Sequence, residues 1–352
     1  TVTASQGPIL NLSDITIGAG GVTFDNLTLT NSVVGTAIRL SNVDGGVFNG
    51  GIVSIGSASG SGILITNDGS ATFNFGDVTM GQTLSPSIRI SNAVTGTVNF
   101  NGTTSLTSFD SSSVRLSGAV AGPVNFADLD INLVTDNTTG IDLSGTTLNG
   151  NLTIDDFELT STSATGTVGI DLTGTTGSGT AQIGDAVVGG ANDANISGVN
   201  DGVLFSSTTN VNLVFGDGEN ATDVDSSISA VTPINDNGTG LPASGSYDFD
   251  DVTLTGDTSN LEAISVYYID QINGGTGSAT NPGTISGAEA STANVYVLLD
   301  TNIDGASDSI DASVQDTGSL NLPDDAALIA YNSGSTAIDV TTLGLSPGGA
   351  PA

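Results

Sequence analysis

The chain has no cysteine, no histidine and no lysine, and three arginines are the only basic side chains among its 352 residues. Without cysteine it can form no disulfide and offers no thiolate. Without histidine or lysine it cannot build the Ser-His-Asp, Cys-His or Ser-Lys arrangements that activate a nucleophile. Paired carboxylates could still supply acid–base chemistry.

Positive charge is scarce while negative charge is abundant, because 37 acidic residues give a net charge of −34. Such a surface has no cationic groove to displace counterions from phosphate, which excludes nucleic acid as a partner. Anionic lipid would repel it as well. We interpret most of this charge as a solvated acidic coat, with specific cation binding as the alternative.

Long apolar runs are also missing. No stretch is long and apolar enough to span a bilayer, so no membrane insertion is expected. The chain begins at Thr1, and no segment joins a basic start to an apolar run, so we expect a signal peptide to be absent or already removed.

Tryptophan is absent and aromatic residues make up 5% of the chain, whereas glycine occurs 49 times. This composition favours many short strands joined by turns. The apolar fraction is enough for a thin continuous core and is a poor fit to one large spherical core.

One short phrase recurs along the chain: an apolar residue, a variable residue, a second apolar residue and then Ser or Thr. It is clearest at 140–145, Gly-Ile-Asp-Leu-Ser-Gly. We call this segment strand A. Clear copies begin at Ile38, Ile63, Ile88, Val114, Ile141 and Ile170, with an early copy at Leu10 and looser ones at Val203, Ile228, Ile264, Ile310 and Ile338.

Two further alternating runs follow each phrase. Strand B is typified by Val124-Asn125-Phe126 and strand C by Leu129-Asp130-Ile131. Successive clear copies of strand A are 25, 25, 26, 27 and 29 residues apart. A fixed order of three short strands, with turns of varying length, is what stacked coils require.

The sequence therefore predicts an all-β fold, a right-handed parallel β-helix of about a dozen coils with three short strands per coil. A β-sandwich is the competing interpretation, although its two sheets would not need a fixed order of phrases. We expect a single domain over 1–345 and a Pro/Gly-rich tail or linker over 346–352. Corner insertions are expected at about 184–202, 232–246, 267–283 and 286–308.

The outward position of strand A holds all three arginines, Arg39, Arg89 and Arg115, followed by Asp142 and Asp171. This column is the candidate face for a ligand or partner, because alternating cations and carboxylates can clamp an acidic or hydroxylated sugar. The alternative is a structural ladder in which Arg115 pairs with Asp142 on the surface.

For the outward asparagines of strand B we favour stacking along the axis. These are Asn74, Asn99, Asn125 and Asn212, with Thr153 in the same column.

Calcium is the one metal that the sequence suggests. Residues 300–311 match the oxygen-ligand spacing of an EF-hand loop, with Gly305 at the bend. Aspartates and asparagines also recur at the corner between strands B and C, where turn capping is the simpler explanation. The candidate calcium ligands are those of the 300–311 loop: Asp300, Asn302, Asp304, Asp308 and Asp311. No organic cofactor is expected.

The phrases at Gly140–Gly145, Val124–Phe126 and Asp251–Leu254 resemble the β-helix repeats of large bacterial surface proteins, the autotransporter passengers and other secreted β-strand-repeat adhesins. The resemblance covers about residues 9–345. It implies export to the surface of a Gram-negative type of cell and a role in attachment, a surface layer or a fibre. Pectate lyases and polygalacturonases share this fold, but their characteristic His, Lys and Arg-x-Lys positions have no match here.

The favoured function is thus an extracellular structural or adhesive β-solenoid, a rod segment of a surface adhesin, surface layer or filament, and not an enzyme. We expect it to associate with itself end to end, or within a longer array, and surface glycans are further candidate partners. The alternative is a carbohydrate-active β-helix, a glycoside hydrolase or lyase that uses a carboxylate pair such as Asp155 with Asp156 or Asp250 with Asp251. A weaker third idea is ice binding by Thr28, Thr79 and Thr253, whose column is not continuous.

Overall fold

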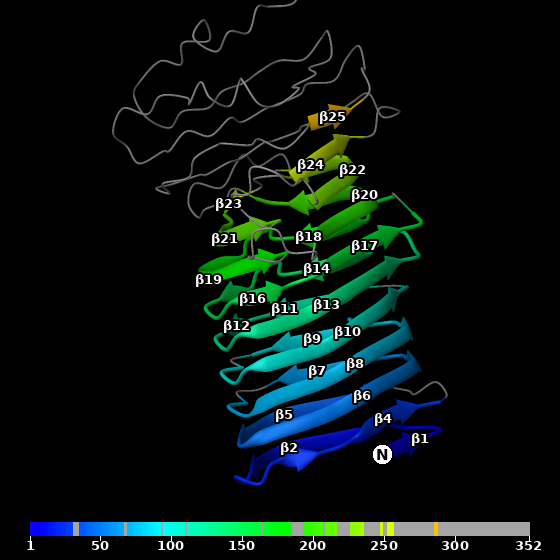
Figure 1. The fold of residues 1–352 in the computed structure, drawn as a ribbon, viewed down its shortest axis with the longest axis vertical. Coiled ribbons are helices and arrows are strands. Elements are labelled where there is room, and N and C mark those ends of the chain that lie inside the picture. The colour runs from blue at the N-terminus through cyan, green and yellow to red at the C-terminus, as the bar shows by residue number, and fades with distance from the viewer. Residues whose placement is uncertain are drawn as a thin grey trace, which may run out of the picture.

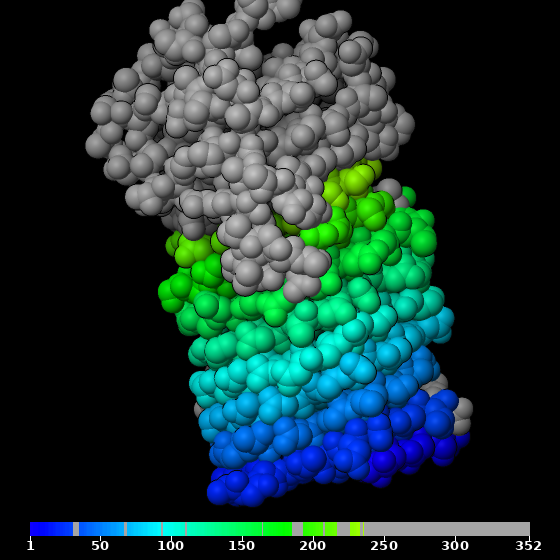
Figure 2. Space-filling model, in the orientation of Figure 1, coloured from blue at the N-terminus to red at the C-terminus, as the bar shows by residue number. Residues whose placement is uncertain are grey.

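The structure is a computed structural model that describes residues 1–30, 35–66, 69–92, 94–109, 111–163, 165–184, 193–206, 208–216, 226–235, 247–248, 252–256 and 285–287. Every element in these ranges is a β-strand, and every pairing between them is parallel. The chain climbs along one axis in about seven turns (Figure 1), and in the space-filling view the coils follow one another in sequence order (Figure 2). The predicted parallel β-helix is confirmed.

The first ladder is built from the A strands. Each pairs with the A strand of the next coil, so that Ile38, Ile63, Ile88, Val114 and Ile141 lie in one column. The early copy at Leu10 also belongs to it, because Leu10 pairs with Ile38. The strands of this ladder are β2 (Leu10–Ile17), β5 (Ile38–Gly45), β7 (Ile63–Thr66), β9 (Ile88–Ser91), β11 (Val114–Ser117), β14 (Thr139–Asp142) and β18 (Val168–Asp171).

The B and C strands form the opposite side of the coil, and in the middle of the stack they join into one long strand with an irregular register at the corner. The B strands are separate in β3 (Val22–Thr23), β16 (Leu152–Ile154), β21 (Asn210–Phe215) and β23 (Tyr247–Asp248). The C strands are separate in β1 (Val2–Ala4), β4 (Asn26–Leu29), β17 (Phe157–Ser161), β24 (Val252–Gly256) and β25 (Ile285–Gly287). The joined strands are β6 (Val47–Ala58), β8 (Thr72–Thr83), β10 (Val98–Ser108) and β13 (Val124–Leu133).

Short strands and further mergers change the number of strands per coil. A small extra ladder lies between A and B, made of β12 (Ala119–Val120), β15 (Thr147–Leu148) and the start of β19 (Thr176–Ile183). Later, β20 (Ala194–Leu204) and β22 (Ser226–Asn235) each run from a C strand into the next A strand. The three predicted ladders A, B and C persist through these changes, because a merged strand keeps its B and C portions on either side of a corner with an irregular register.

The core is a set of stacked apolar columns. Alternate side chains of each strand point inward, so Ile141, Leu143, Leu129 and Ile131 are buried while the residues between them face outward. The inward residues of all three ladders form one continuous cluster through the described coils. Burial of these columns holds the coils together, at roughly 25 cal/mol per Å² of apolar surface.

Phenylalanine rings fill the B side of the core. The rings of Phe100 and Phe126 stack at 4.4 Å with an interplanar angle of 3°, and Phe75 stacks on Phe100 at 5.1 Å. Gly50 supplies the space for this stack at its N-terminal side, because a Cβ there would lie 2.7 Å from the Phe75 ring. Glycine at this corner is thus a packing requirement.

The outward asparagines of strand B form the predicted ladder. The Nδ2 atom of each side chain donates to the oxygen of the preceding coil, from Asn125 to Asn99 at 2.8 Å and from Asn99 to Asn74 at 2.8 Å. Asn74 donates in turn to Asn49 at 3.0 Å. The expected stacking along the axis is confirmed for these residues, and it fixes the register of B strands that carry few other specific contacts.

Two register predictions are wrong. Asn212 pairs with Thr180, so Val214 takes the place predicted for it in the asparagine column, opposite Gln182. Ile228 pairs with Ile196 in the C ladder, and Ile234 occupies the A position instead. Both errors arise because A, B and C strands share the same alternating pattern, so an irregular spacing shifts the assignment.

Parts of three predicted insertions are described by the structure. Residues 194–202 belong to β20, residues 232–235 to β22 and residues 286–287 to β25, so they continue the ladders instead of bulging from a corner. They pair in register with strands of the preceding coil. The insertion predicted at 267–283 and the tail at 346–352 lie outside the described residues. In the part of the chain that the structure describes, no helix is long and apolar enough to cross a membrane.

Candidate functional site

The A face consists of the outward side chains of the A ladder. The pairing of β2, β5, β7, β9, β11, β14 and β18 places the predicted residues in one column. The structure therefore brings together the whole predicted set. In order along the axis the column reads Asn11, Arg39, Leu64, Arg89, Arg115, Asp142 and Asp171.

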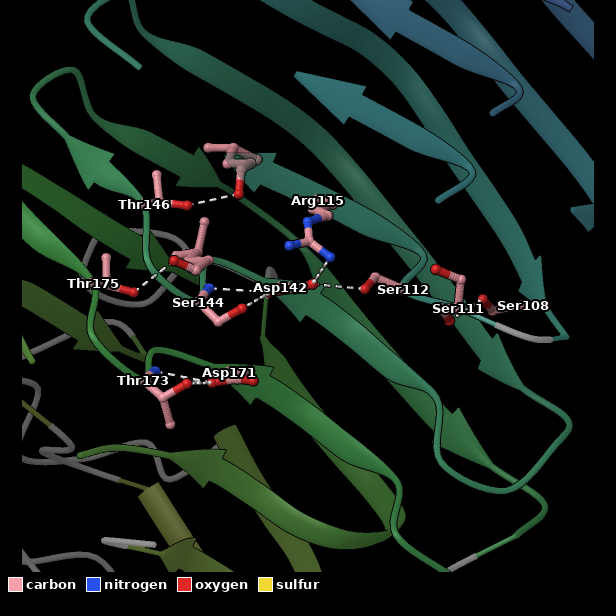
Figure 3. Close-up of polar contacts among 12 residues, drawn as sticks. Ser108, Ser111, Ser112, Arg115, Asp142, Ser144, Thr146, Asp171, Thr173 and Thr175 are labelled. Carbon is pink, nitrogen blue, oxygen red and sulfur yellow. Dashed lines mark hydrogen bonds and ion pairs between the residues drawn. The ribbon is translucent and has the colours of Figure 1, made fainter. Parts of the chain in front are cut away.

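Asp142 is the best-connected residue of the A face (Figure 3). Its Oδ2 atom lies 3.1 Å from Nη1 of Arg115 and accepts a hydrogen bond of 2.9 Å from the Ser112 hydroxyl. Its Oδ1 atom accepts from the backbone N–H and from the hydroxyl of Ser144, at 3.0 and 2.6 Å. The side chain of Asp142 is 9% exposed. Both of its oxygens accept hydrogen bonds or ion pairs from its own turn and from the preceding coil, so this carboxylate stabilises the stack and has little surface left for a ligand.

Asp171 repeats part of this arrangement one coil later. Its Oδ1 atom accepts from the backbone N–H and the hydroxyl of Thr173, at 2.9 and 2.7 Å. Burial raises the pKa of Asp171, the Thr173 hydrogen bonds oppose that rise, and the nearby Asp142 charge adds to it. Asp142 thus has a cationic partner in Arg115, whereas Asp171 holds its turn without an ion pair among the described residues.

The threonines that follow these turns tie neighbouring coils together. The hydroxyl of Thr146 donates to the Leu116 carbonyl at 2.6 Å, and that of Thr175 donates to the Leu143 carbonyl at 2.7 Å. Both threonines are fully buried. The turn sequence Asp-Leu-Ser/Thr-Gly-Thr-Thr at 142–147 and 171–176 is therefore a structural unit that stacks from coil to coil.

The remaining arginines are in a different situation. Arg39 and Arg89 are exposed, and neither has a hydrogen-bond or ion-pair partner among the described residues. Arg39 makes the smallest contribution to the lowered pKa of Asp14, after hydrogen bonds from Asn42 and Ser13. Of the five residues predicted for this face, these two are free to meet a partner.

The C face, formed by the outward side chains of the C ladder, carries a cluster of carboxylates in which Asp130 and Glu158, which the sequence did not single out, join the corner aspartates Asp128 and Asp156. Asp130 pairs in register with Glu158, and Asp128 precedes Asp130 by two residues on the same face. Burial raises the pKa of Asp130, and the charges of Asp128, Glu158 and Asp156 raise it further. Burial followed by the Asp128 and Glu158 charges raises the pKa of Asp156 as well.

A shallow groove runs beside this cluster, lined by Ser105, Leu106, Asp130, Ile131, Asn132, Glu158 and Thr160. The hydroxyl column suggested for ice binding is interrupted here and resumes only at Ser227 and Thr253. Thr28, Ser54, Thr79 and Ser105 follow one another in register, and carboxylates take the next two positions. The one signal of this groove in the sequence is the presence of acidic residues at the outward positions of successive C strands.

The calcium prediction is not tested by these coils. All five predicted ligands, Asp300, Asn302, Asp304, Asp308 and Asp311, lie outside the described residues, as do Asp250 and Asp251 of the second carboxylate pair. Within the described coils no group of three or more acidic side chains is arranged to hold a metal ion. At the B–C corner Asp128 accepts a hydrogen bond of 2.6 Å from the Thr103 hydroxyl of the preceding coil.

Comparisons with protein-family models, with curated proteins and with solved structures found no match to this chain.

Proposed function

We propose that this chain is an extracellular structural or adhesive β-solenoid, a rod segment of a bacterial surface adhesin, surface layer or filament. The single observation that carries the proposal is the use of polar side chains as connections between coils. Asp142, Ser112, Thr146 and the asparagine ladder all bond to the backbone or side chains of a neighbouring coil. A fold whose polar side chains bond neighbouring coils to one another is suited to forming a rigid rod.

Self-association end to end, or within a longer array, is part of this proposal. Inward residues of the first coil, among them Leu10, Leu12, Val22 and Phe24, pack on the core but are only partly buried. A strand edge with apolar residues beneath it readily accepts another strand. In this proposal the edge pairs with another copy of the chain.

The structural role is tested by incubating the purified chain with a panel of neutral and acidic polysaccharides and measuring newly formed chain ends. A structural rod leaves every polysaccharide intact. Steady cleavage that disappears in a single Asp→Asn variant would overturn the proposal, provided that the variant keeps the melting temperature of the parent.

A second function, a carbohydrate-active enzyme, is favoured by one observation on the C face. Asp130 has a raised pKa and lies beside Glu158 on the neighbouring strand, in a groove. In-register residues of adjacent strands lie about 4.8 Å apart, near the separation of roughly 5 Å between the two carboxyl groups of retaining glycosidases. Asp130 would act as the acid and Glu158 as the nucleophile. Loss of any cleavage in both Asp130→Asn and Glu158→Gln, with Asp44→Asn unaffected, is the result that this alternative requires.

Calcium binding by Asp300, Asn302, Asp304, Asp308 and Asp311 forms part of the proposal, because carboxylates at this spacing suit a hard cation. Calcium bound to the folded chain alone would raise its melting temperature. Thermal melts with added calcium and with a chelator test this, and Asp304→Asn with Asp300→Asn should remove the difference. Identical melts in calcium and chelator would contradict the assignment.

A further inference from the structure

The three arginines form a column with an uneven spacing, here called the arginine column. Arg39 of β5, Arg89 of β9 and Arg115 of β11 occupy equivalent outward positions, and Leu64 of β7 lies between the first two. Each coil rises about 4.8 Å. The column therefore has a gap of two coils followed by a gap of one coil, read from the N-terminal end.

The C face carries carboxylates with the same spacing, here called the acidic column. Asp128 pairs with Thr103, and the flanking registers place Asp77 one coil before Thr103 and Asp156 one coil after Asp128. From Asp77 to Asp128 is two coils and from Asp128 to Asp156 is one. The order of these two gaps is the same as in the arginine column, and the register of β17 with β20 adds a fourth carboxylate, Asp193, one coil after Asp156.

This match selects one arrangement of two copies. If both rods point the same way and one is displaced by a single coil, Arg39 faces Asp77, Arg89 faces Asp128 and Arg115 faces Asp156. If one rod is reversed, the order of its gaps is reversed, and at most two of the three pairs can align. The spacing therefore favours parallel rods.

The position of the two faces allows the contact to repeat. The ladder of β5, β7, β9 and β11 lies behind the long strands β6, β8, β10 and β13 (Figure 1), so the arginine and acidic columns are on opposite sides of the molecule. In a pair of copies, one uses its arginine column and the other its acidic column. The acidic column of the first copy and the arginine column of the second therefore remain available. Further copies can then add in an open row.

We propose that a second copy of this chain docks its acidic column on the arginine column, with the two rods parallel and one coil out of step. The contact supplies a lateral partner for the structural role proposed above and rests on it. Charge complementarity identifies the occupant. A chain of net charge −34 offers anionic surface, and its positive charge is confined to this one column.

Both columns gain from the contact. Arg39 and Arg89 have no ion-pair partner among the described residues, whereas the Asp128, Asp156 and Glu158 charges repel one another on the C face. Guanidinium groups brought against these carboxylates relieve that repulsion and can form bidentate hydrogen bonds.

Salt concentration gives the contact a recognisable signature. At about 0.01 M salt the Debye length is about 30 Å, so the large net charges of two copies repel each other. At about 0.1 M it is about 10 Å, which screens that repulsion more than the short arginine–carboxylate pairs, and at about 1 M the pairs are screened as well. Association should therefore be strongest at intermediate salt.

The test is sedimentation equilibrium of the full chain across this range, with a matched pair of variants. Arg39→Gln with Arg89→Gln removes two positive charges, and Ala119→Glu with Ala121→Glu adds two negative charges at an exposed corner. Both change the net charge from −34 to −36. The parent and the variant with Ala119→Glu and Ala121→Glu should both associate. The association constant of the variant with Arg39→Gln and Arg89→Gln should be at least about tenfold lower than that of the parent.

A charge-reversal pair makes the test independent of folding defects. Arg39→Glu with Arg89→Glu gives one chain two acidic faces, and Asp77→Arg with Asp128→Arg gives another chain two basic columns. Each alone should remain monomeric, and their equimolar mixture should associate.

Three results would overturn the lateral contact. They are monomers for the parent at every salt concentration, equal association of the two −36 variants, and a charge-reversal mixture that stays monomeric. Arginine-dependent binding of dextran sulfate by a parent that never self-associates would assign the arginine column to an anionic glycan instead. None of these outcomes decides the structural role, which is judged by the polysaccharide assay.

Discussion

Asp142 shows how a single residue can be both the variable position of a repeat and a fixed structural element. Its carboxylate joins the Ser144 turn, the Ser112 hydroxyl and the Arg115 guanidinium. Asp171 occupies the equivalent position one coil later and bonds only within its own turn, to Thr173. The two residues form a natural comparison of a paired and an unpaired carboxylate.

The first prediction is that Asp142→Ala lowers the free energy of unfolding by about 2–3 kcal/mol, because it leaves buried donors without their acceptor. Asp171→Asn should cost less than about 1 kcal/mol, because burial already penalises the charge of that residue. Denaturant melts of both variants measure the difference. A loss for Asp142→Ala no larger than that for Asp171→Asn would contradict a stabilising role for the contacts of Asp142.

The second prediction concerns packing. Phe100 lies between the rings of Phe75 and Phe126, so Phe100→Ala opens a cavity inside the stack. We expect a loss of about 3–5 kcal/mol in the free energy of unfolding, and a smaller loss for Phe100→Leu. Thermal or denaturant melts test this, with the exposed Leu84→Ala as the control. A cost for Phe100→Ala no larger than that control would contradict the ring stack.

At the scale of strands, the sequence was sufficient to predict the ladders but not every register. The phrases around Ile38, Ile63 and Ile88 have constant spacing, and the alternation of each phrase specifies its inward face. Around Ile228 the spacing is irregular, and the same alternation fits the A or the C column. Local pattern specifies which face a residue occupies, whereas its column depends on the length of every preceding turn.

The candidate site shows the same limit. The column of Arg39, Arg89 and Arg115 follows directly from the repeat, and so does the pairing of Arg115 with Asp142. The repulsion between Asp130 and Glu158 did not, because it depends on the register between β13 and β17 and on the partial burial of their side chains.

The third prediction uses that repulsion. A carboxyl group whose folded-state pKa is raised destabilises the fold above that pKa, and the penalty is relieved as pH falls through it. Asp130 and Asp156 are both of this kind. Asp130→Asn should therefore raise the melting temperature at pH 7, with a stability gain below about 1 kcal/mol because the group is only partly buried and solvent screens its charge.

The size of this gain should fall with acidity and with salt. Below the ordinary Asp pKa of about 3.9 the carboxyl group is neutral in both states, so the variant and the parent should melt alike. At about 1 M salt the gain at pH 7 should shrink as well. A gain that stays constant between pH 7 and pH 3 would mean that the substitution acts through packing and not through charge.

At the scale of the whole molecule, an acidic rod has to remain extended while still meeting its partners. The net charge of −34 repels other copies at long range, and in the lateral contact proposed above the arginine column is the place where two copies meet at short range. The inward apolar columns and outward hydrogen-bond ladders repeat along the described coils, so each coil is a template for the next. Rigidity and lateral contact would then arise from the same repeat.

The most direct test of this account is electron microscopy of the purified chain at about 0.1 M salt, where its charges are screened beyond about 10 Å. The account predicts straight rods lying side by side in rows, and it predicts single rods for Arg39→Gln with Arg89→Gln under the same conditions. Isolated compact particles for the parent chain at every concentration would contradict it.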